Sequence, residues 1–499
     1  MTESNPSPSS GVLSQGLISM AAYGVNSVAS FFAVIGMIRL LGRDDWGLFA
    51  LAIQIIAFTS MIADFGIGPV IMRRLAIAPG RAASIVLEAT TSRLLLLVPT
   101  WIVSLLVGWW LAPGWEFFLL LNLMLVNLVI SAKVPVLRGT LESFYRSQSR
   151  MALPTVTTAV DALMLLAMVL VVPASFHDPV RAMVLYTASN LLGALWLGVA
   201  GWRFIRRLNT ESVRVTVPGM RELLATSAPL AVFLILNALH ITIDSIYLKH
   251  FHGDAAVGLF NAALRIMTPL SIFPAIITIS AAPYFARASV AEDDEQRARM
   301  SRLFSLSVKT LLIGSVLLSG FGVTNAKLLL HAAFGGKFDD AALPMMLLFA
   351  LFLPMSLNIF LVELNNARGR LRENTRFAAI LAAVSCVSGV FLISAHAAPG
   401  AAVAKFLAIL AGLAFLIFHS REGIAVAMKP LAAKSALLLI ALVGVRLLLD
   451  AQHWLLSNTA ALLAFLVALI LLRVYSADEL AQWRAQFASL LRRTPGGTA

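Results

Sequence analysis

Two stretches far apart in the sequence decide how this chain folds. The first reads LGRDDWGLFALA, Leu41–Ala52, and the second reads HGDAAVGLFNAA, His252–Ala263, 211 positions later. Aligned, they share five positions: Gly42/Gly253, Gly47/Gly258, Leu48/Leu259, Phe49/Phe260 and Ala52/Ala263. Because glycine tolerates the positive φ of a tight reversal, each copy predicts a turn of the chain followed by a new apolar helix.

The composition predicts a membrane protein. Of the 499 residues, 59% are hydrophobic and 13% are charged, whereas soluble domains have about 25% charged residues. Apolar runs of about 20 residues, the length that crosses a bilayer, recur throughout the chain. The single cysteine, Cys386, excludes an intramolecular disulfide and a cysteine-based zinc site.

We expect an all-α polytopic membrane protein with about 14 transmembrane helices. The expected spans are 12–38, 46–70, 84–111, 117–136, 153–173, 181–204, 224–248, 257–283, 304–331, 342–366, 377–395, 399–419, 431–449 and 455–473. The two copies of the repeat follow spans 1 and 7, so an even number of spans separates them and both face the same way. This pattern predicts a parallel repeat of six helices, with two halves related by an axis along the membrane normal.

The distribution of basic residues fixes the expected orientation. With the N-terminus in the cytoplasm, 26 of the 38 Lys and Arg residues lie in cytoplasmic segments and six lie at outer ends. Basic residues favour the cytoplasmic side of short loops. The net charge of +13 therefore reports membrane topology rather than a nucleic-acid partner, and both termini are expected in the cytoplasm.

The spans and linkers predict six regions. They are a disordered cytoplasmic tail (1–11), an N-lobe (12–204), a cytoplasmic linker (205–223), a C-lobe (224–420), an extra helix pair (421–473) and an amphipathic cytoplasmic tail (474–499). Four prolines, Pro229, Pro269, Pro274 and Pro354, are expected to bend helices because proline removes a backbone hydrogen bond.

The repeat and its surroundings also resemble a known family. RLLGRDDWGLFALA followed by ADFGIGPVIMRRLA resembles the opening of Wzx-type polysaccharide flippases, in the polysaccharide transporter branch of the multidrug/oligosaccharidyl-lipid/polysaccharide (MOP) exporter superfamily. Pro229, Asp244, Gly253, VGLFNAALRI and Pro283 are similar to that family's seventh and eighth helices. The resemblance covers spans 1 to 12. The final pair, 431–473, is similar in count to fourteen-helix relatives, including lipid II flippases.

The resemblance implies two pseudo-symmetric six-helix lobes around a central cavity that opens alternately to the two sides. Its cargo would be an undecaprenyl-diphosphate-linked oligosaccharide, moved between the leaflets of the bacterial inner membrane for surface polysaccharide or exopolysaccharide assembly. Membrane lipids, polysaccharide polymerase and chain-length machinery are the partners that it suggests. The sequence contains no GxxxxGK[ST] or HExxH motif, so we expect no cofactor and no enzymatic activity.

Charged residues inside spans are costly and usually line a transport path. Arg93 in span 3 and Arg265 in span 8, with Asn261 one helical turn before Arg265, form the predicted site for the diphosphate, because arginine binds phosphate in a bidentate manner. The alternative is a structural ion pair between Arg265 and Asp244.

The seventh span predicts a coupling site. His240 and Asp244 share one helix face with Asn237; Asp244 is a candidate for a proton or cation, and His240 titrates near neutral pH. Asp161 in span 5 is a further buried candidate. The structural alternative is that Asp244 neutralises an arginine and that His240 hydrogen-bonds locally.

Three polar residues of span 10 are predicted to contact sugar hydroxyls: Asn358, Glu363 and Asn365. Hydrogen bonding between helices is the alternative. Two other charged residues have structural expectations. Asp64 in span 2 is a further buried acid, with capping of its helix or pairing with Arg73 or Arg74 as the structural alternative. Lys405 is expected to extend outward to the membrane surface.

Three other functions are alternatives, and the intramembrane charges count against one of them, a non-transporting membrane scaffold. A cation-coupled antiporter of the multidrug and toxin extrusion (MATE) type would share the fold but need a more acidic cavity. A membrane polysaccharide polymerase or ligase would be expected to carry a large outer loop, whereas no outer loop here exceeds about a dozen residues.

Overall fold

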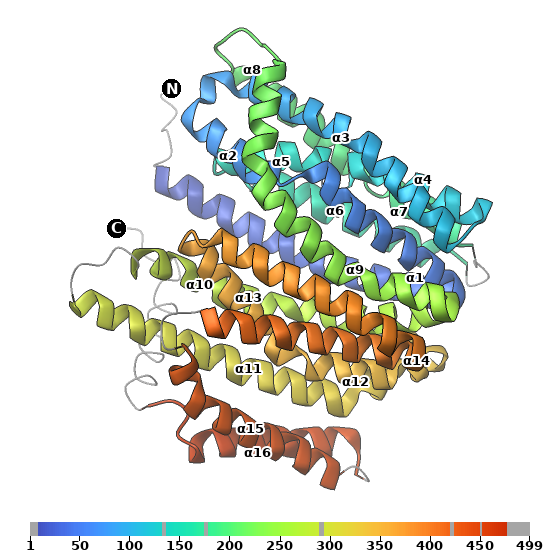
Figure 1. Ribbon diagram of the computed structural model, residues 1–499, viewed down its shortest axis with the longest axis vertical. Helices are drawn as coiled ribbons and strands as arrows, with labels where there is room; N and C mark the ends of the chain where they lie inside the picture. Colours follow the sequence, from blue (N-terminus) through green and yellow to red (C-terminus); the bar gives the residue numbers. More distant parts are fainter. Residues whose placement is uncertain are drawn as a thin grey trace, which may run out of the picture. The chain divides into compact units, whose positions relative to one another are not determined.

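The computed structural model describes residues 8–131, 136–173, 178–288, 294–419, 424–449 and 452–476. Every regular element in these ranges is helical, as predicted (Figure 1). The predicted tail 477–499 and the first seven residues lie outside them. The first nine α-helices are α1 (Pro8–Asp64), α2 (Ile67–Ile77), α3 (Ala82–Leu111), α4 (Trp115–Ile130), α5 (Leu137–Ser147), α6 (Ala152–Val171), α7 (Pro179–Ala188), α8 (Leu191–Leu208) and α9 (Val217–Met267).

The second part of the chain continues in the same way. Its α-helices are α10 (Ile272–Ala288), α11 (Asp294–Phe334), α12 (Ala342–Ala350), α13 (Phe352–Ala367), α14 (Leu371–His419), α15 (Ile424–Leu448) and α16 (Trp454–Leu471). Three short 3₁₀ turns, η1 (Pro79–Arg81), η2 (Thr268–Ser271) and η3 (Gly336–Ala341), connect neighbouring helices.

Two units pack separately. Unit 1 comprises Met1–Pro269, Lys327–Pro344 and Thr375–Ala408, and unit 2 comprises Leu270–Ala326, Met345–Asn374 and Ile409–Ala499. Unit 1 therefore contains the whole predicted N-lobe and three segments of the predicted C-lobe. In unit 1, α1 packs along both α9 and α6; in unit 2, α10 packs on α13, and α15 packs on α16.

The membrane-spanning character of the chain is confirmed, while the count of fourteen spans stays a prediction. Eight helical runs of the described chain are long and apolar enough to cross a bilayer, or nine with the bent pair α12–α13. Three of them have 63, 62 and 49 residues, about two to three times the length that one crossing needs. Each of these three contains a backbone kink, so each can fold back as a hairpin.

The kinks in α1 and α9 fall on the two copies of the repeat. Gly42 has φ 80° and ψ −170°, and Gly253 has φ 79° and ψ −170°. Residues that have a Cβ atom rarely adopt this backbone conformation. The glycine shared by both copies therefore makes the same reversal twice. The third kink, in α14, is at Ala397, with φ 49° and ψ −130°.

Two predicted spans are interrupted for identifiable reasons. Span 181–204 breaks between α7 and α8, where the Ser189 hydroxyl and the Asn190 amide both donate to the Tyr186 carbonyl, at 2.8 and 2.7 Å. Such side chains compete with the helical hydrogen bonds. Span 342–366 bends by 43° at Leu351, three residues before Pro354, which cannot donate a backbone hydrogen bond.

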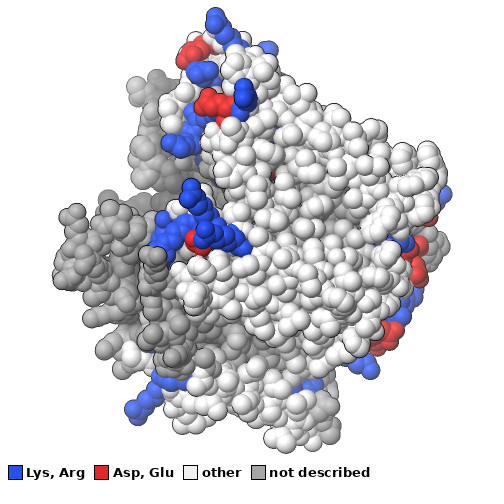
Figure 2. All heavy atoms as spheres, viewed as in Figure 1, with Lys and Arg blue, Asp and Glu red and all other residues white. Residues whose placement is uncertain are grey.

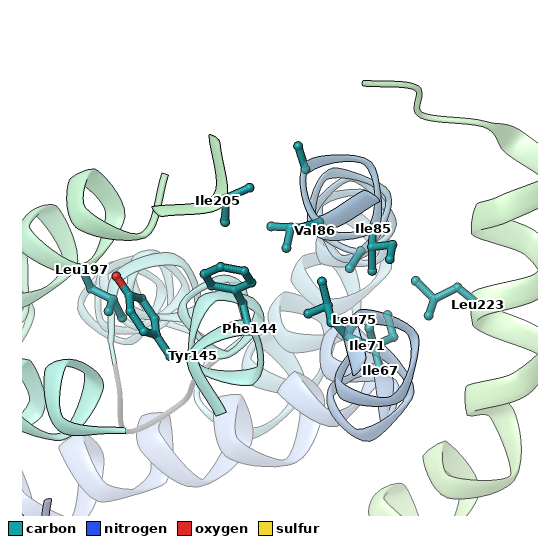
Figure 3. Close-up of a cluster of buried hydrophobic side chains, with 13 residues drawn as sticks. Ile67, Ile71, Leu75, Ile85, Val86, Phe144, Tyr145, Leu197, Ile205 and Leu223 are labelled. Carbon is teal, nitrogen blue, oxygen red and sulfur yellow. The ribbon is translucent and has the colours of Figure 1, made fainter. Parts of the chain in front are cut away.

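An apolar cluster fixes the helices of unit 1 at the end opposite the glycine kinks, which we call the linker end because residues 209–216 lie there. Side chains from α2, α3, α5, α8 and α9 meet in it (Figure 3): Ile67, Ile71, Leu75, Ile85, Val86, Phe144, Tyr145, Leu197, Ile205 and Leu223. Burial of several large side chains at about 2 kcal/mol each makes this end a firm support. We call the other end of unit 1 the kink end.

Candidate functional site

The two repeat copies cross each other at the kink end. A Cβ atom built on Gly47 would lie 1.9 Å from the carbonyl oxygen of Asp254, and one built on Gly258 would lie 2.1 Å from that of Arg43. Only a residue without a side chain fits either position. The contacts are reciprocal, as expected of two equivalent elements related by a two-fold axis, and they close the kink end of unit 1 around this crossing.

Basic side chains reinforce the closure. From α1, Arg39 donates to the carbonyl oxygens of Ala332 and Ala333, at 2.6 and 2.5 Å. Arg43 forms an ion pair of 2.8 Å with Asp340. Ala332 and Ala333 lie in the last turn of α11 and Asp340 lies in η3, so the end of α11 and the turn after it are tied to the first repeat copy.

A chain of amide and hydroxyl groups continues inward from the crossing. The Gln54 amide donates to Asn261 Oδ1 at 3.0 Å, and Asn261 Nδ2 donates to Ser245 Oγ at 3.1 Å and to the Val257 carbonyl at 3.0 Å. Asn261, predicted to bind substrate, is buried and its hydrogen bonds join α1 to α9. In this structure its geometry is that of a residue holding the two repeat copies together.

Arg265 lies one turn beyond Asn261 and has a different environment. Its guanidinium is 6.0 Å from the centroid of the Trp46 ring, at the outer limit of a cation–π contact. Trp46 is 1% exposed, whereas Arg265 is half-buried. In the described part of the chain, Arg265 makes no hydrogen bond or ion pair, and the alternative pairing with Asp244 does not occur.

Arg93, the other predicted phosphate ligand, is enclosed. It is 1% exposed, forms an ion pair with Asp64, and donates to Thr140 Oγ1 at 2.7 Å. The alternative pairing of Asp64 with Arg73 or Arg74 therefore does not occur. Arg93 reaches Asp64 because α3 packs along α1, a contact that the linear spacing of 29 residues does not reveal.

Asp161 belongs to a second buried ion pair. Its Oδ2 lies 2.5 Å from Arg138 Nη1, and its Oδ1 accepts from the Gly193 backbone at 3.1 Å. Both side chains of the pair are 2% exposed. Glu142, one turn along α5 and outside the predicted spans, also faces Arg138; burial raises the pKa of Glu142 and outweighs the opposing effect of Arg138.

The predicted coupling residues form a third cluster. Lys405 Nζ lies 2.6 Å from Asp244 Oδ2, and His240 Nδ1 lies 2.6 Å from Ser385 Oγ. Asp244 is fully buried and Lys405 is 7% exposed. The expectation that Lys405 extends to the membrane surface is therefore wrong, because its ammonium group neutralises a buried carboxylate on α9.

The three span-10 residues lie in unit 2 and have separate environments. Asn358 is 5% exposed; it donates to the Ile409 carbonyl at 3.0 Å, and its Oδ1 has no hydrogen-bond partner among the described residues. Asn365 donates to Asn374 at 3.0 Å. Glu363 is exposed. Asn365 thus fastens the end of α13 to the start of α14, whereas Asn358 keeps a buried acceptor.

Sequence analysis missed three residues of this arrangement: Gln54, Trp46 and Arg138. A signal for Gln54 was present, because the 211-residue register of the repeat, continued by two positions, aligns Gln54 with Arg265. Trp46 lies inside the quoted first copy. No sequence signal connects Arg138 with Asp161.

Comparison with known proteins agrees with this architecture. Residues 12–289 match the model of the family described as "Polysaccharide biosynthesis protein". Among solved structures, the chain is similar to the lipid II flippase MurJ in an inward closed conformation (TM-score 0.71, 12% identity, covering 92% of this chain and 99% of that one).

Multidrug transporters share the fold as well. The chain is similar to an inward-facing MATE family transporter of the MOP superfamily (TM-score 0.64, 13% identity, covering 83% and 99% of the two chains). It is also similar to the eukaryotic MATE transporter AtDTX14 (TM-score 0.53, 16% identity, covering 92% and 100%). No curated protein matches the sequence significantly.

Proposed function

Because the chain belongs to the polysaccharide biosynthesis protein family, we propose that it is a flippase for an undecaprenyl-diphosphate-linked oligosaccharide. The lipid would pass from the inner to the outer leaflet of the bacterial inner membrane and supply surface polysaccharide assembly. The fold supports a MOP-type transporter, and the charges of unit 1 support an anionic cargo.

The observation that carries the proposal is that three acids of unit 1 have ion-pair partners, whereas Arg265 has none in the described chain. Three acids that the sequence places inside spans of unit 1 each have a basic partner: Asp64 with Arg93, Asp161 with Arg138, and Asp244 with Lys405. Arg265 has no acidic partner in the described chain. An intramembrane cation without a counter-charge is costly, so an anionic ligand that supplies the missing charge would be bound there.

Arg265 suits a diphosphate for chemical reasons. Moving the diphosphate and sugars across hydrocarbon is costly, whereas the polyprenyl tail can stay in lipid. Guanidinium groups form bidentate, charge-assisted hydrogen bonds with phosphate oxygens. We assign Arg265 as the main phosphate contact and Arg93 as a residue that supports the site through Asp64. As a separate proposal for unit 2 taken by itself, Asn358 and Glu363 would contact sugar hydroxyls, with Asn365 as their support.

The kink end would be the outer gate. The basic bias favours a cytoplasmic linker end, and with that orientation the crossing of Gly47 and Gly258 would close the outer side. Transport by alternating access would require this crossing to separate. The backbone contact between two glycines has no side chains to interlock, which favours a contact that can open and re-form.

Ion coupling would act through the third cluster. A proton or cation that reaches Asp244 competes with the Lys405 ammonium for the same carboxylate. We propose that this exchange, rather than occupation of an empty site, links an ion to movement of α9. His240, held by Ser385, positions α9 beside it, and Asp161 is assigned to its buried pair with Arg138.

The MATE-type alternative predicts a different charge pattern. An exporter of cationic drugs needs an acidic group that is free to bind the drug. The three acids named above are paired with bases, and the unpaired charge, on Arg265, is positive. This pattern favours the anionic lipid over a cationic drug.

The function is tested by the leaflet position of the lipid-linked oligosaccharide in cells depleted of this protein. A membrane-impermeant glycan label reports the outer leaflet. We expect the intermediate to accumulate and to stay inaccessible from outside. If it becomes accessible but stays unpolymerised, the protein acts after translocation, as a polymerase or scaffold would.

A further inference from the structure

An open pocket of about 560 Å³ lies at the linker end of unit 1. It is walled by the start of α1, the junction of α5 with α6, and the C-terminal two thirds of α8. All the residues that line it fall between Gln15 and Arg207. The helices α1 and α8 belong to runs long and apolar enough to cross a membrane and begin or end there, so the pocket would lie at the boundary between lipid headgroups and hydrocarbon.

Three arginines give the pocket its charge. Arg203 and Arg207 lie one turn apart on α8, and Arg150 lies with its guanidinium 4.8 Å from the centroid of the Phe204 ring. No acidic residue lines the pocket. All three arginines are exposed. None of them forms an ion pair within the described ranges. Figure 2 shows Lys and Arg atoms, with Asp and Glu atoms among them, near the C-terminal end of α8.

The rest of the wall is apolar and continues into the lipid-facing surface. Leu153, Val156 and Trp196 line the pocket, and Leu195 and Val199, on the same helix as Trp196, are 65% and 51% exposed. A ligand that fills the pocket would therefore place an anionic group among the arginines and apolar chains along α8. A lipid with an anionic headgroup fits both features, whereas a free anion would use only the arginines.

The pocket rests on rigid structure. Tyr145, which lines it, belongs to the buried cluster together with Leu197 and Ile205 of α8 (Figure 3). The arginines therefore project from helices that are fixed relative to one another. Basic pockets between membrane helices at the headgroup level are suited to phosphate-bearing lipid headgroups.

We propose that this pocket is a binding site for the headgroup of an anionic phospholipid of the surrounding bilayer. The lipid-linked cargo offers the same phosphate chemistry, but a cargo that moves between the two halves would need contacts from the second half, and every lining residue belongs to the first. A volume of about 560 Å³ is sufficient for a glycerophosphate headgroup. The proposal does not depend on the transported substrate.

The test compares two triple variants of the purified full-length protein in equal mixtures of phosphatidylglycerol and phosphatidylcholine. Native mass spectrometry then counts the lipids retained. R150Q/R203Q/R207Q removes the pocket charges, and R73Q/R206Q/R221Q removes three exposed arginines elsewhere in unit 1. We expect the pocket variant to lose at least about tenfold in phosphatidylglycerol retention and the control to stay within about twofold of wild type. Equal losses in both variants would overturn the proposal.

A second variant protects the test against misfolding. Ala200 lines the pocket, so Ala200→Trp fills it without changing charge, and we expect it to lower phosphatidylglycerol retention as well. Unchanged retention by Ala200→Trp would contradict binding inside the pocket. Two competitors distinguish the sources of phosphate. Displacement by inorganic phosphate would identify a simple anion site, and preferential displacement by undecaprenyl diphosphate would identify a cargo site; either result would overturn the assignment to a bilayer phospholipid.

Discussion

Arg93 and Arg265 both place a guanidinium on a membrane helix of unit 1, but their surroundings differ. Arg93 is buried against Asp64 and Thr140, whereas Arg265 is half-buried beside the ring of Trp46 with no acid in the described chain to neutralise it. The first arrangement satisfies a charge within the protein, and the second leaves it to a ligand. Residue type and depth in a span are therefore insufficient to identify a binding residue, because the partner decides the role.

The largest expected effect follows from removing the unpaired charge. Arg265→Gln should reduce polysaccharide export by about a hundredfold, because truncating one member of a desolvated charge pair costs about 2–5 kcal/mol. Arg265→Lys should retain part of the activity, since it keeps the charge but loses the bidentate geometry. Export is measured per molecule of protein in the membrane, with Arg206→Gln as the control. Full export by Arg265→Gln would remove this residue from the site.

Arg93 should instead report on stability. Arg93→Met leaves the Asp64 carboxylate without its partner and should lower the free energy of unfolding by about 3 kcal/mol. The double variant Arg93→Met/Asp64→Leu should recover most of that loss, because replacing a buried ion pair with apolar groups is often neutral.

Denaturant unfolding of the purified protein measures both variants, and export is measured in parallel. If the double variant is stable but exports nothing, Arg93 contacts the cargo directly and the contrast with Arg265 disappears.

The crossing of the repeat copies allows a smaller, conformational test. Gly47→Leu places a side chain against the Asp254 backbone, and overpacking of this kind costs about 1–3 kcal/mol. In a Cys386→Ala background with a single cysteine at Asp45, labelling by an impermeant thiol reagent should become about tenfold faster. Gly198→Leu is the control, because no atom lies within 4 Å of a Cβ built there. Equal labelling rates in the two variants would mean that the crossing is not a gate.

The smallest expected effects are changes in stability for variants at the three helix kinks. Gly42→Ala and Gly253→Ala should each destabilise the protein by about 1–2 kcal/mol, because a Cβ is disfavoured at positive φ. Ala397→Gly should stabilise it by about 1 kcal/mol for the same reason. Thermal unfolding in one detergent is a sufficient measurement. A destabilised Ala397→Gly would show that the alanine side chain has a packing role that outweighs its backbone strain.

The repeat explains why so much of the fold could be predicted from the sequence. Local features, such as the shared glycines, the apolar runs and Pro354, act within a few residues and predicted the kinks, the helices and the bend. Ion pairs join residues of distant helices: Asp244 meets Lys405 and Asp161 meets Arg138 only after the helices pack. The sequence therefore identified the charged residues but could not show which of them neutralise each other.

The most direct test of the account is the leaflet position of the lipid-linked oligosaccharide in cells whose only copy of the protein carries Arg265→Gln. The impermeant glycan label is applied to intact cells, with wild-type and Arg206→Gln cells alongside. The account predicts an accumulated intermediate that the label does not reach in Arg265→Gln cells and reaches in both controls. Labelling of the intermediate in Arg265→Gln cells at the wild-type level would contradict the claim that the unpaired guanidinium carries the diphosphate.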